Sequence, residues 1–326
     1  MTGEIHIHPW QRAAWSQLRQ RVESNRLPHA LLLCGPEGLG KRAMAQRLGQ
    51  LLLCQAPREG MPCGVCDSCQ LVQAGNHPDL YLVEPEEGSK TIKVDAVREL
   101  SRSLGLKSQY GGRRVGLITP AERMTVNAAN SLLKTLEEPP EDAVLVLVSH
   151  HPAGLPATIR SRCQMQTIPA PDVTAAAEWL EEQGASGAEG LLGLVGNAPL
   201  AAMRLHEQGG GEAMGTLLDQ LADLAAGTIS PVEAAGRWQK DQIDMVTRLL
   251  VSIAIDLART REAGLKPRIS RLNQLPGTLD SLALHGFLDD LLEQRRLAEH
   301  PLNAHMQLEA LLVRWRDISA REGVHG

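Results

Sequence analysis

The feature that most constrains this chain is the glycine-rich segment Gly35–Lys41 (G-P-E-G-L-G-K), which matches the phosphate-loop pattern G-x-x-x-x-G-K. The apolar run Ala30–Cys34 precedes it, and a helical pattern from Lys41 to about Leu53 follows it. In a strand–loop–helix setting, backbone N–H groups and the helix dipole form a cradle for anions, and the lysine reaches terminal phosphates. The sequence therefore predicts a P-loop domain whose nucleotide-binding residues are Gly35, Gly38, Gly40 and Lys41.

Short apolar runs that alternate with helical patterns continue this domain through the first half of the chain. Further strands are predicted at Leu80–Val83, Val115–Ile118 and Val144–Ser149, and helices at Val94–Leu104 and Ala121–Leu136. Short, fully apolar strands separated by helices are typical of a parallel sheet that helices cover on both faces. Beyond the break at 168–171 (I-P-A-P) no segment has the pattern of a strand, so the predicted fold class is α/β followed by all-α.

The 326 residues suffice for two or three domains. We predict three: a P-loop domain at 1–168, a small helical domain at 169–208, and a second helical domain at 209–326, which begins at three consecutive glycines. Helices are predicted at Thr174–Gln183 and Leu191–Leu205. The last helix places Leu308, Leu311, Leu312 and Trp315 on one face, a spacing that favours a buried core stripe over a partner surface.

The charge distribution argues against a protein that coats nucleic acid. The formal net charge is −5, and residues 169–326 carry 22 Asp and Glu against 14 Lys and Arg. Residues 1–168 carry 19 Lys and Arg against 16 Asp and Glu, so local contact with phosphates is confined to this half. One Phe, two Tyr and five Trp are too few for a platform that stacks single-stranded bases.

The apolar content points to a protein that stays in the compartment where it is made. No window approaches the 18 uninterrupted apolar residues of a membrane span. The first fifteen residues lack the basic and then apolar pattern of a signal peptide. We therefore expect a cytoplasmic protein without membrane contact.

Four of the six cysteines, Cys54, Cys63, Cys66 and Cys69, have the spacing C-x8-C-x2-C-x2-C. Four thiolates satisfy tetrahedral Zn²⁺ and leave no position open for water, so the pattern predicts one structural zinc ion in a small inserted module at 54–69. An iron–sulfur cluster is the main alternative, but Gln73 stands where a ferredoxin pattern needs its completing cysteine. Four unligated thiols are the remaining alternative.

The phosphate loop lacks the groups that catalysis needs. Active P-loop enzymes follow the lysine with Ser or Thr, whose hydroxyl ligates Mg²⁺, but Arg42 stands here. The strand that ends at Ile118 is followed by Thr119 and Pro120 in place of acidic residues, and Glu122 comes too late, as a charge at the start of the next helix. The sequence therefore predicts no intrinsic ATPase activity.

One arginine is a candidate for action on another molecule. Arg162 lies in the segment 158–163 (T-I-R-S-R-C), just after the last predicted strand. An arginine at such a domain edge can reach a neighbouring subunit's nucleotide and stabilise charge on the transferred phosphoryl group. From its position alone, a solvated surface charge is the simpler interpretation.

Taken together, these motifs resemble the delta-prime family of clamp-loader subunits of bacterial DNA polymerase III, in the AAA+ superfamily. The resemblance spans residues 9–163 and rests on P-W at 9–10, R-L-P-H-A at 26–30, the phosphate loop, the four cysteines, H-P-D at 77–79, the segment 127–140 (N-A-A-N-S-L-L-K-T-L-E-E-P-P) and S-R-C at 161–163. Support beyond residue 171 is thinner, with G-N-A-P at 196–199 and L-E-A-L-L at 308–312.

The resemblance implies an AAA+ nucleotide-binding-type domain with a zinc module, a helical lid and a helical collar that assembles a five-membered ring. It implies a rigid stator that does not hydrolyse ATP, in agreement with Arg42. Arg162 would be the arginine finger that completes the ATP site of an adjacent subunit. The implied partners are the tau/gamma-type ATPase subunits, the delta subunit, the sliding clamp and primed DNA, within the DNA polymerase holoenzyme. The retained Lys41 leaves nucleotide binding without hydrolysis open.

Two other functions compete with this interpretation. An active clamp-loader ATPase of the tau/gamma type shares the zinc module and S-R-C, but it should carry Ser or Thr at position 42 and acidic residues after Ile118. A zinc-stabilised DNA-binding module unrelated to the loader is disfavoured by the acidic second half and the scarcity of aromatic residues.

Overall fold

The computed structural model describes residues 7–110, 112–269, 271–275, 279–297 and 304–320. The chain forms two compact units, Met1–Pro171 and Asp172–Gly326, which are considered separately below. The boundary between these units lies at the proline-containing break. The further division of the second unit into a lid and a collar near residue 208 stays a prediction.

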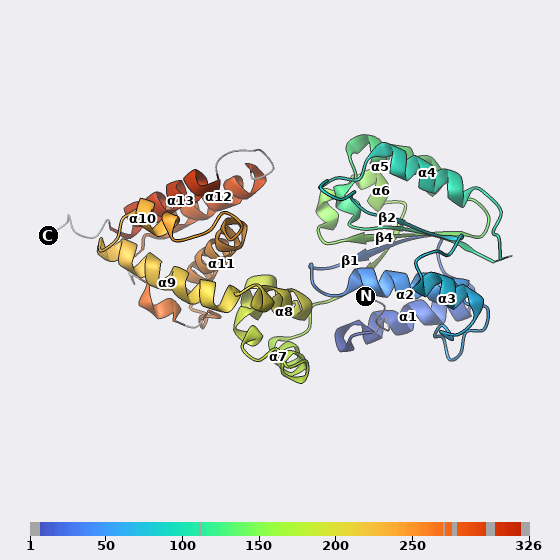
Figure 1. Ribbon diagram of the computed structural model, residues 1–326, viewed down its shortest axis with the longest axis horizontal. Coiled ribbons are helices and arrows are strands. Elements are labelled where there is room, and N and C mark those ends of the chain that lie inside the picture. The colour runs from blue at the N-terminus through green and yellow to red at the C-terminus, as the bar shows by residue number, and fades with distance from the viewer. Residues whose placement is uncertain (1–6, 111, 270, 276–278, 298–303, 321–326) are drawn as a thin grey trace. The chain divides into compact units, whose positions relative to one another are not determined.

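The first unit is built on a five-stranded parallel sheet in the order β2-β3-β4-β1-β5. The strands are β1 Ala30–Cys34, β2 Leu80–Val83, β3 Arg114–Ile118, β4 Ala143–Ser149 and β5 Gln164–Thr167. Every residue of the three central strands is buried, and all of them are apolar except Arg114 and Ser149. Helices α4 and α5 cover one face of the sheet, and α1, α2 and α3 lie on the other (Figure 1). The predicted α/β fold class is confirmed.

The helical elements of this unit surround the sheet and supply its connections. They are η1 Pro9–Gln11, α1 Arg12–Glu23, α2 Lys41–Leu53, α3 Asp67–Gln73, α4 Val94–Leu104, η2 Ala121–Arg123, α5 Val126–Glu137, η3 Pro152–Gly154 and α6 Ala157–Arg160. The prediction of a single helix at Ala121–Leu136 was wrong. The chain is extended at Met124 and Thr125, because the Thr125 hydroxyl accepts a hydrogen bond from the N–H of Ala128 and caps a new helix.

The edge strand β5 was not predicted. Its sequence Gln-Met-Gln-Thr contains one apolar residue, and its side chains are mostly exposed. Backbone pairing with β1 creates the strand, with Leu31 opposite Gln164 and Cys34 opposite Thr167. An edge strand that contributes so little to the core carries no apolar pattern for sequence analysis to detect.

Every regular element in the described part of the second unit is helical, which confirms the all-α prediction for this half. The elements are α7 Val173–Glu182, η4 Ala188–Val195, α8 Pro199–Glu207, α9 Gly210–Ala226, α10 Pro231–Gly236, α11 Ile243–Glu262, η5 Leu272–Gln274, α12 Ser281–Leu297 and α13 Ala304–Ser319. The prediction of one continuous helix at Leu191–Leu205 was wrong. Gly196 and Asn197 adopt positive φ angles of 62° and 59°, and this turn separates η4 from α8. No helix in the described ranges is both long enough and apolar enough to cross a membrane.

The predicted stripe on α13 is a core stripe. All four of its residues are buried, and Trp315 is fully inaccessible to solvent. The indole Nε1 of Trp315 donates to the Leu221 carbonyl oxygen at 2.9 Å, and its ring lies 5.7 Å from that of Phe287. This single side chain therefore joins α13 to α9 and α12 within one apolar core.

The carboxylate of Asp256 on α11 holds the loop that follows this helix. Its buried carboxylate accepts hydrogen bonds from the backbone N–H groups of Arg268 and Ile269 at 2.7 and 2.9 Å, and pairs with Arg259 at 2.6 Å. We expect Asp256→Ala to lower the free energy of unfolding by about 3 kcal/mol, because two N–H donors and a guanidinium lose their acceptor. Urea unfolding measures this loss.

The matched control is Asp244→Ala on the same helix. Asp244 pairs with Arg248 on an exposed surface, so its removal should change the free energy of unfolding by less than about 1 kcal/mol. Equal effects of the two substitutions would contradict the role assigned to Asp256.

Candidate functional site

The phosphate loop lies where β1 ends and α2 begins, and its backbone requires glycine. Gly35 and Gly40 have φ angles of 146° and 76°, in the region that side chains other than glycine rarely adopt. A Cβ atom on Gly35 would lie 2.4 Å from the Ile168 carbonyl oxygen, and one on Gly40 would lie 2.9 Å from the Gln11 and His8 side chains. The structure thus brings the predicted residues Gly35, Gly38, Gly40 and Lys41 into one P-loop turn.

Lys41 is buried against this loop, with 2% of its surface exposed. Its Nζ donates to the carbonyl oxygens of Gly35 and Pro36, both at 2.6 Å. Burial lowers the pKa of Lys41 to about 8, although the nearby Glu122 and Glu37 carboxylates oppose the shift. The ammonium group is therefore held inside the loop by two main-chain acceptors.

Arg42 extends from the position that holds Ser or Thr in active P-loop enzymes. Its guanidinium pairs with the carboxylate of Glu84, just beyond β2, with Nη2 and Oε2 2.5 Å apart. Burial raises the pKa of Glu84, and the Arg42 charge opposes that rise. A cationic side chain and its counter-ion thus stand in place of a hydroxyl that can ligate Mg²⁺. Glu84 was not recognised from the sequence, because nothing in the spacing links it to position 42.

Glu122 serves the loop after β4 rather than the start of a long helix. It lies in η2, and its Oε1 accepts hydrogen bonds from the backbone N–H groups of His150 and His151 at 2.8 and 3.2 Å. Burial alone would raise the pKa of this carboxyl, but the hydrogen bonds it accepts outweigh burial and lower it. The ionised carboxylate therefore fixes the chain where it leaves β4.

Arg162 follows the short helix α6, with its side chain 36% exposed. Its Nη1 donates to the Thr158 carbonyl oxygen at 3.0 Å, and its Nη2 lies 2.6 Å from Oε1 of Glu137 at the end of α5. The structure therefore places the predicted arginine at the surface, in a defined orientation. Its partner Glu137 belongs to a motif noted in the sequence, but their contact across 25 residues was not predicted.

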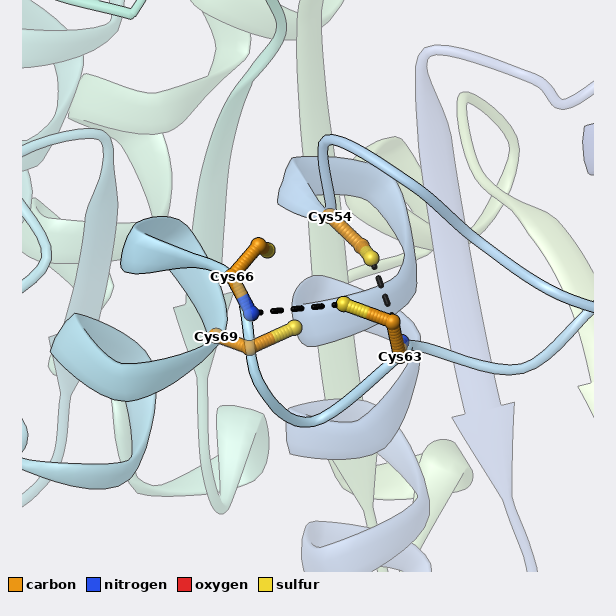
Figure 2. A group of neighbouring side chains, drawn as sticks. All are labelled: Cys54, Cys63, Cys66 and Cys69. Carbon is orange, nitrogen blue, oxygen red and sulfur yellow. Dashed lines mark hydrogen bonds between the residues drawn. The ribbon is translucent and has the colours of Figure 1, made fainter.

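The four cysteines come together at the junction of α2, a loop and α3 (Figure 2). Their Sγ atoms all lie within 4.8 Å of one another. The N–H of Cys63 donates to the sulfur of Cys54 at 3.2 Å, and the N–H of Cys66 donates to that of Cys63 at 3.4 Å. Backbone N–H groups of Val65 and Cys66 lower the pKa of the Cys63 thiol to about 6.

This arrangement fits a metal ion. Sulfur atoms around tetrahedral Zn²⁺ with Zn–S bonds of 2.3 Å are about 3.8 Å apart, a separation that falls within the 4.8 Å limit of the cluster. N–H donors that point at sulfur favour the thiolate form, which is the form that binds metal, whereas burial raises the pKa of the Cys54 and Cys69 thiols. The four cysteines can therefore bind a metal ion, and their chemistry is compatible with zinc.

His77 lies near this cluster but is not available as a ligand. Its Nδ1 accepts from the N–H of Asp79 at 3.0 Å, so the proton of the neutral ring lies on Nε2, which is 2.7 Å from the Ser68 oxygen. The Ser68 hydroxyl in turn donates to the Leu53 carbonyl oxygen at 2.6 Å. Burial lowers the pKa of His77, which favours this neutral form. This chain of hydrogen bonds joins the two ends of the cysteine segment.

Lys41 gives the site a pH-dependent signature. Because its pKa is lower in the folded chain than in the unfolded chain, the unfolded chain binds more protons between about pH 8 and 10, and folding stability rises with pH in that window. Relative to Lys41→Met, which cannot titrate, the wild-type chain should gain at most about 3 kcal/mol between pH 7 and 10. Chemical unfolding at several pH values measures this difference. A difference that does not change with pH would contradict the buried position of the ammonium group.

The comparisons with known proteins agree with these motifs. Residues 10–172 match the family described as "DNA polymerase III, delta subunit". DNA polymerase III subunit delta' of Pseudomonas aeruginosa is 41% identical over 327 residues, which cover 96% of this chain and 98% of that protein. The Escherichia coli subunit delta' is 39% identical over 218 residues, covering 66% of this chain and 65% of that protein.

A solved structure shares the fold. The DNA polymerase III gamma subunit-related protein of Thermotoga maritima superimposes with a TM-score of 0.50 at 20% identity, covering 94% of this chain and 99% of that chain. This likeness extends through both units, and the match to the Pseudomonas aeruginosa subunit extends through nearly the whole chain. The chain therefore belongs to the delta-prime family of bacterial DNA polymerase III subunits.

Proposed function

We propose that this protein is a clamp-loader subunit that hydrolyses no ATP itself, braces the ring and presents Arg162 to ATP bound by an adjacent ATPase subunit. The observation that carries the proposal is the Arg42–Glu84 ion pair, which stands where the P-loop of an ATPase would offer a ligand to Mg²⁺. Thr119 and Pro120, which follow β3, supply neither the carboxylate that would help to hold Mg²⁺ nor a base. The protein would act in the cytoplasm as part of the DNA polymerase holoenzyme.

The chemistry of Arg162 suits this role. Its guanidinium is planar, stays charged at every physiological pH and matches the geometry of phosphate oxygens. Placed against the γ-phosphate of a neighbouring ATP, it would stabilise the negative charge that spreads over the phosphoryl oxygens in the transition state. The partners in this proposal are tau/gamma-type ATPase subunits, the delta subunit, the sliding clamp and primed DNA.

The two competing functions fit the structure less well. An intrinsic ATPase would need a residue other than Arg42 to hold Mg²⁺, and Glu84 is engaged by Arg42. Among the described residues, the cysteine cluster is the one cluster with metal-ligand geometry. Its segment is hydrogen-bonded to the end of α2 in the same unit through Ser68 and Leu53, an arrangement that suits a structural element of this unit better than a separate DNA-binding module. Nucleotide binding without hydrolysis at Lys41 stays compatible with the proposal.

Turnover of ATP by the reconstituted loader tests the proposal. With primed DNA and clamp present, Arg162→Ala should lower the turnover at least about tenfold, which corresponds to about 1.4 kcal/mol of barrier. Arg160→Ala, an exposed arginine two residues away, is the matched control and should leave turnover unchanged. The isolated chain should show no turnover, and a rate on the order of 1 s⁻¹ from it alone would refute the stator role.

We further propose that Cys54, Cys63, Cys66 and Cys69 hold one structural Zn²⁺ per chain. A bound zinc ion would supply folding energy by joining the end of α2 to the start of α3. The hydrogen bonds from Cys63 and Cys66 N–H groups to neighbouring sulfurs orient the thiolates for this task. The hydrogen-bonded pair of Ser68 and His77 holds the same segment from its other side.

Metal analysis tests the cysteine assignment. We expect one equivalent of zinc in the wild-type chain and less than about 0.2 equivalents in Cys66→Ser after dialysis against a chelator, because a three-sulfur site binds zinc more weakly. Cys163→Ser, a cysteine outside the cluster, should retain the full equivalent. Iron with acid-labile sulfide in place of zinc would instead support the iron–sulfur alternative.

A further inference from the structure

Glu137 occupies an unfavourable position for an acidic side chain. It is the last residue of α5, and Glu138 follows it at the C-cap. The helix macrodipole disfavours negative charge at a C-terminus. Two prolines come next and stop the helix, so the position of Glu137 at the helix end is fixed by the chain itself. An acidic residue kept at such a place calls for a compensating interaction.

The compensating interaction is made with Arg162. Oε1 of Glu137 lies 2.6 Å from Nη2 of Arg162, while Nη1 of the same guanidinium donates to the Thr158 carbonyl oxygen at 3.0 Å. Both terminal nitrogens of the guanidinium thus have a fixed acceptor, one on α5 and one on α6. Glu138, which carries the same charge one residue later, makes no ion pair within the described ranges.

The backbone around Arg162 is also held in place. Its N–H donates to the Ile159 carbonyl oxygen at 3.1 Å, and the Ile159 side chain is completely buried beside α5. The segment that contains Arg162 therefore follows a loop that Glu122 fixes and continues into strand β5. Because the backbone is fixed at both ends, the long side chain of Arg162 is the remaining source of conformational freedom, and Glu137 and Thr158 restrict it.

Such restriction matters for an arginine that acts on a neighbour's nucleotide. A long, flexible arginine side chain loses rotamer entropy when its guanidinium is immobilised at the phosphate. An arginine side chain that is already ordered in the free subunit loses less entropy when it engages the phosphate. The ion pair is half-exposed, with 36% and 50% of the two side chains accessible, so its own contribution to stability is small.

We propose that Glu137 is a positioning residue for the arginine finger, which orders the Arg162 guanidinium before the neighbouring ATP arrives. The inference rests on the proposed function of Arg162. Glu137 touches no nucleotide in this scheme and acts only through the guanidinium it pairs with. The opposite scheme, in which Glu137 withholds Arg162 from the phosphate, predicts faster turnover when the carboxylate is neutralised.

The experiment compares Glu137→Gln with Glu138→Gln in the loader reconstituted with clamp and primed DNA. The two substitutions remove the same charge at adjacent exposed positions, so bulk electrostatics and the helix dipole change alike. We expect Glu137→Gln to lower kcat for ATP by about three- to tenfold, with the KM for ATP unchanged within about twofold, because the partner's binding pocket is intact. Glu138→Gln should retain kcat, and melting of the isolated chain should be alike for both variants.

A double-mutant cycle isolates the path of the effect. If Glu137 acts only through Arg162, then Arg162→Ala combined with Glu137→Gln should be no slower than Arg162→Ala alone. Glu137→Asp, which keeps the charge on a shorter side chain, should recover part of the loss. Additive losses in the double variant, equal kcat for the two glutamine variants, or a faster Glu137→Gln loader would each overturn the inference.

The outcomes separate this inference from the proposed function. If Arg162→Ala lowers turnover while Glu137→Gln does not, Arg162 acts as a finger without Glu137, and only the positioning role fails. If Arg162→Ala leaves turnover unchanged, the finger role fails and the positioning role fails with it.

Discussion

Parallel pairing between β1 and β4 is the constraint on which the functional region depends. Ala30–Cys34 runs beside Leu145–Ser149 in the same direction, so both strands end at one edge of the sheet. The phosphate loop begins immediately after one strand, and the loop bound by Glu122 begins immediately after the other. Ligand sites of open α/β sheets lie beyond the carboxyl ends of their strands, and this pairing places both loops at that edge of the sheet.

The central part of this arrangement could be predicted from the sequence because its signals are local. The apolar runs of β1, β3 and β4 and the glycine pattern before Lys41 each lie within a few residues, and each is required by burial or by positive φ. The grouping of the four cysteines could be predicted for the same reason, because all four lie within sixteen consecutive residues at a spacing typical of metal ligands. The fold class followed from these elements together.

The remainder depended on contacts between residues distant in sequence. The strand β5 exists through its backbone pairing with β1, and the break before α5 depends on the hydroxyl cap at Thr125. The pairings of Arg42 with Glu84 and of Arg162 with Glu137 join charged residues that have many other acceptable partners on a surface. Periodicity and spacing contain no information about such choices, so only the folded chain reveals them.

Strand β5 determines how the chain beyond Arg162 is held. It directly follows Arg162 and Cys163, and backbone hydrogen bonds to β1 hold it while most of its side chains face solvent. Gln164 and Thr167 can therefore be exchanged for many other residues without moving the strand. Because the main chain rather than the side chains anchors this edge, the chain that leaves Arg162 is held in place without a need for particular side chains at Gln164 and Thr167.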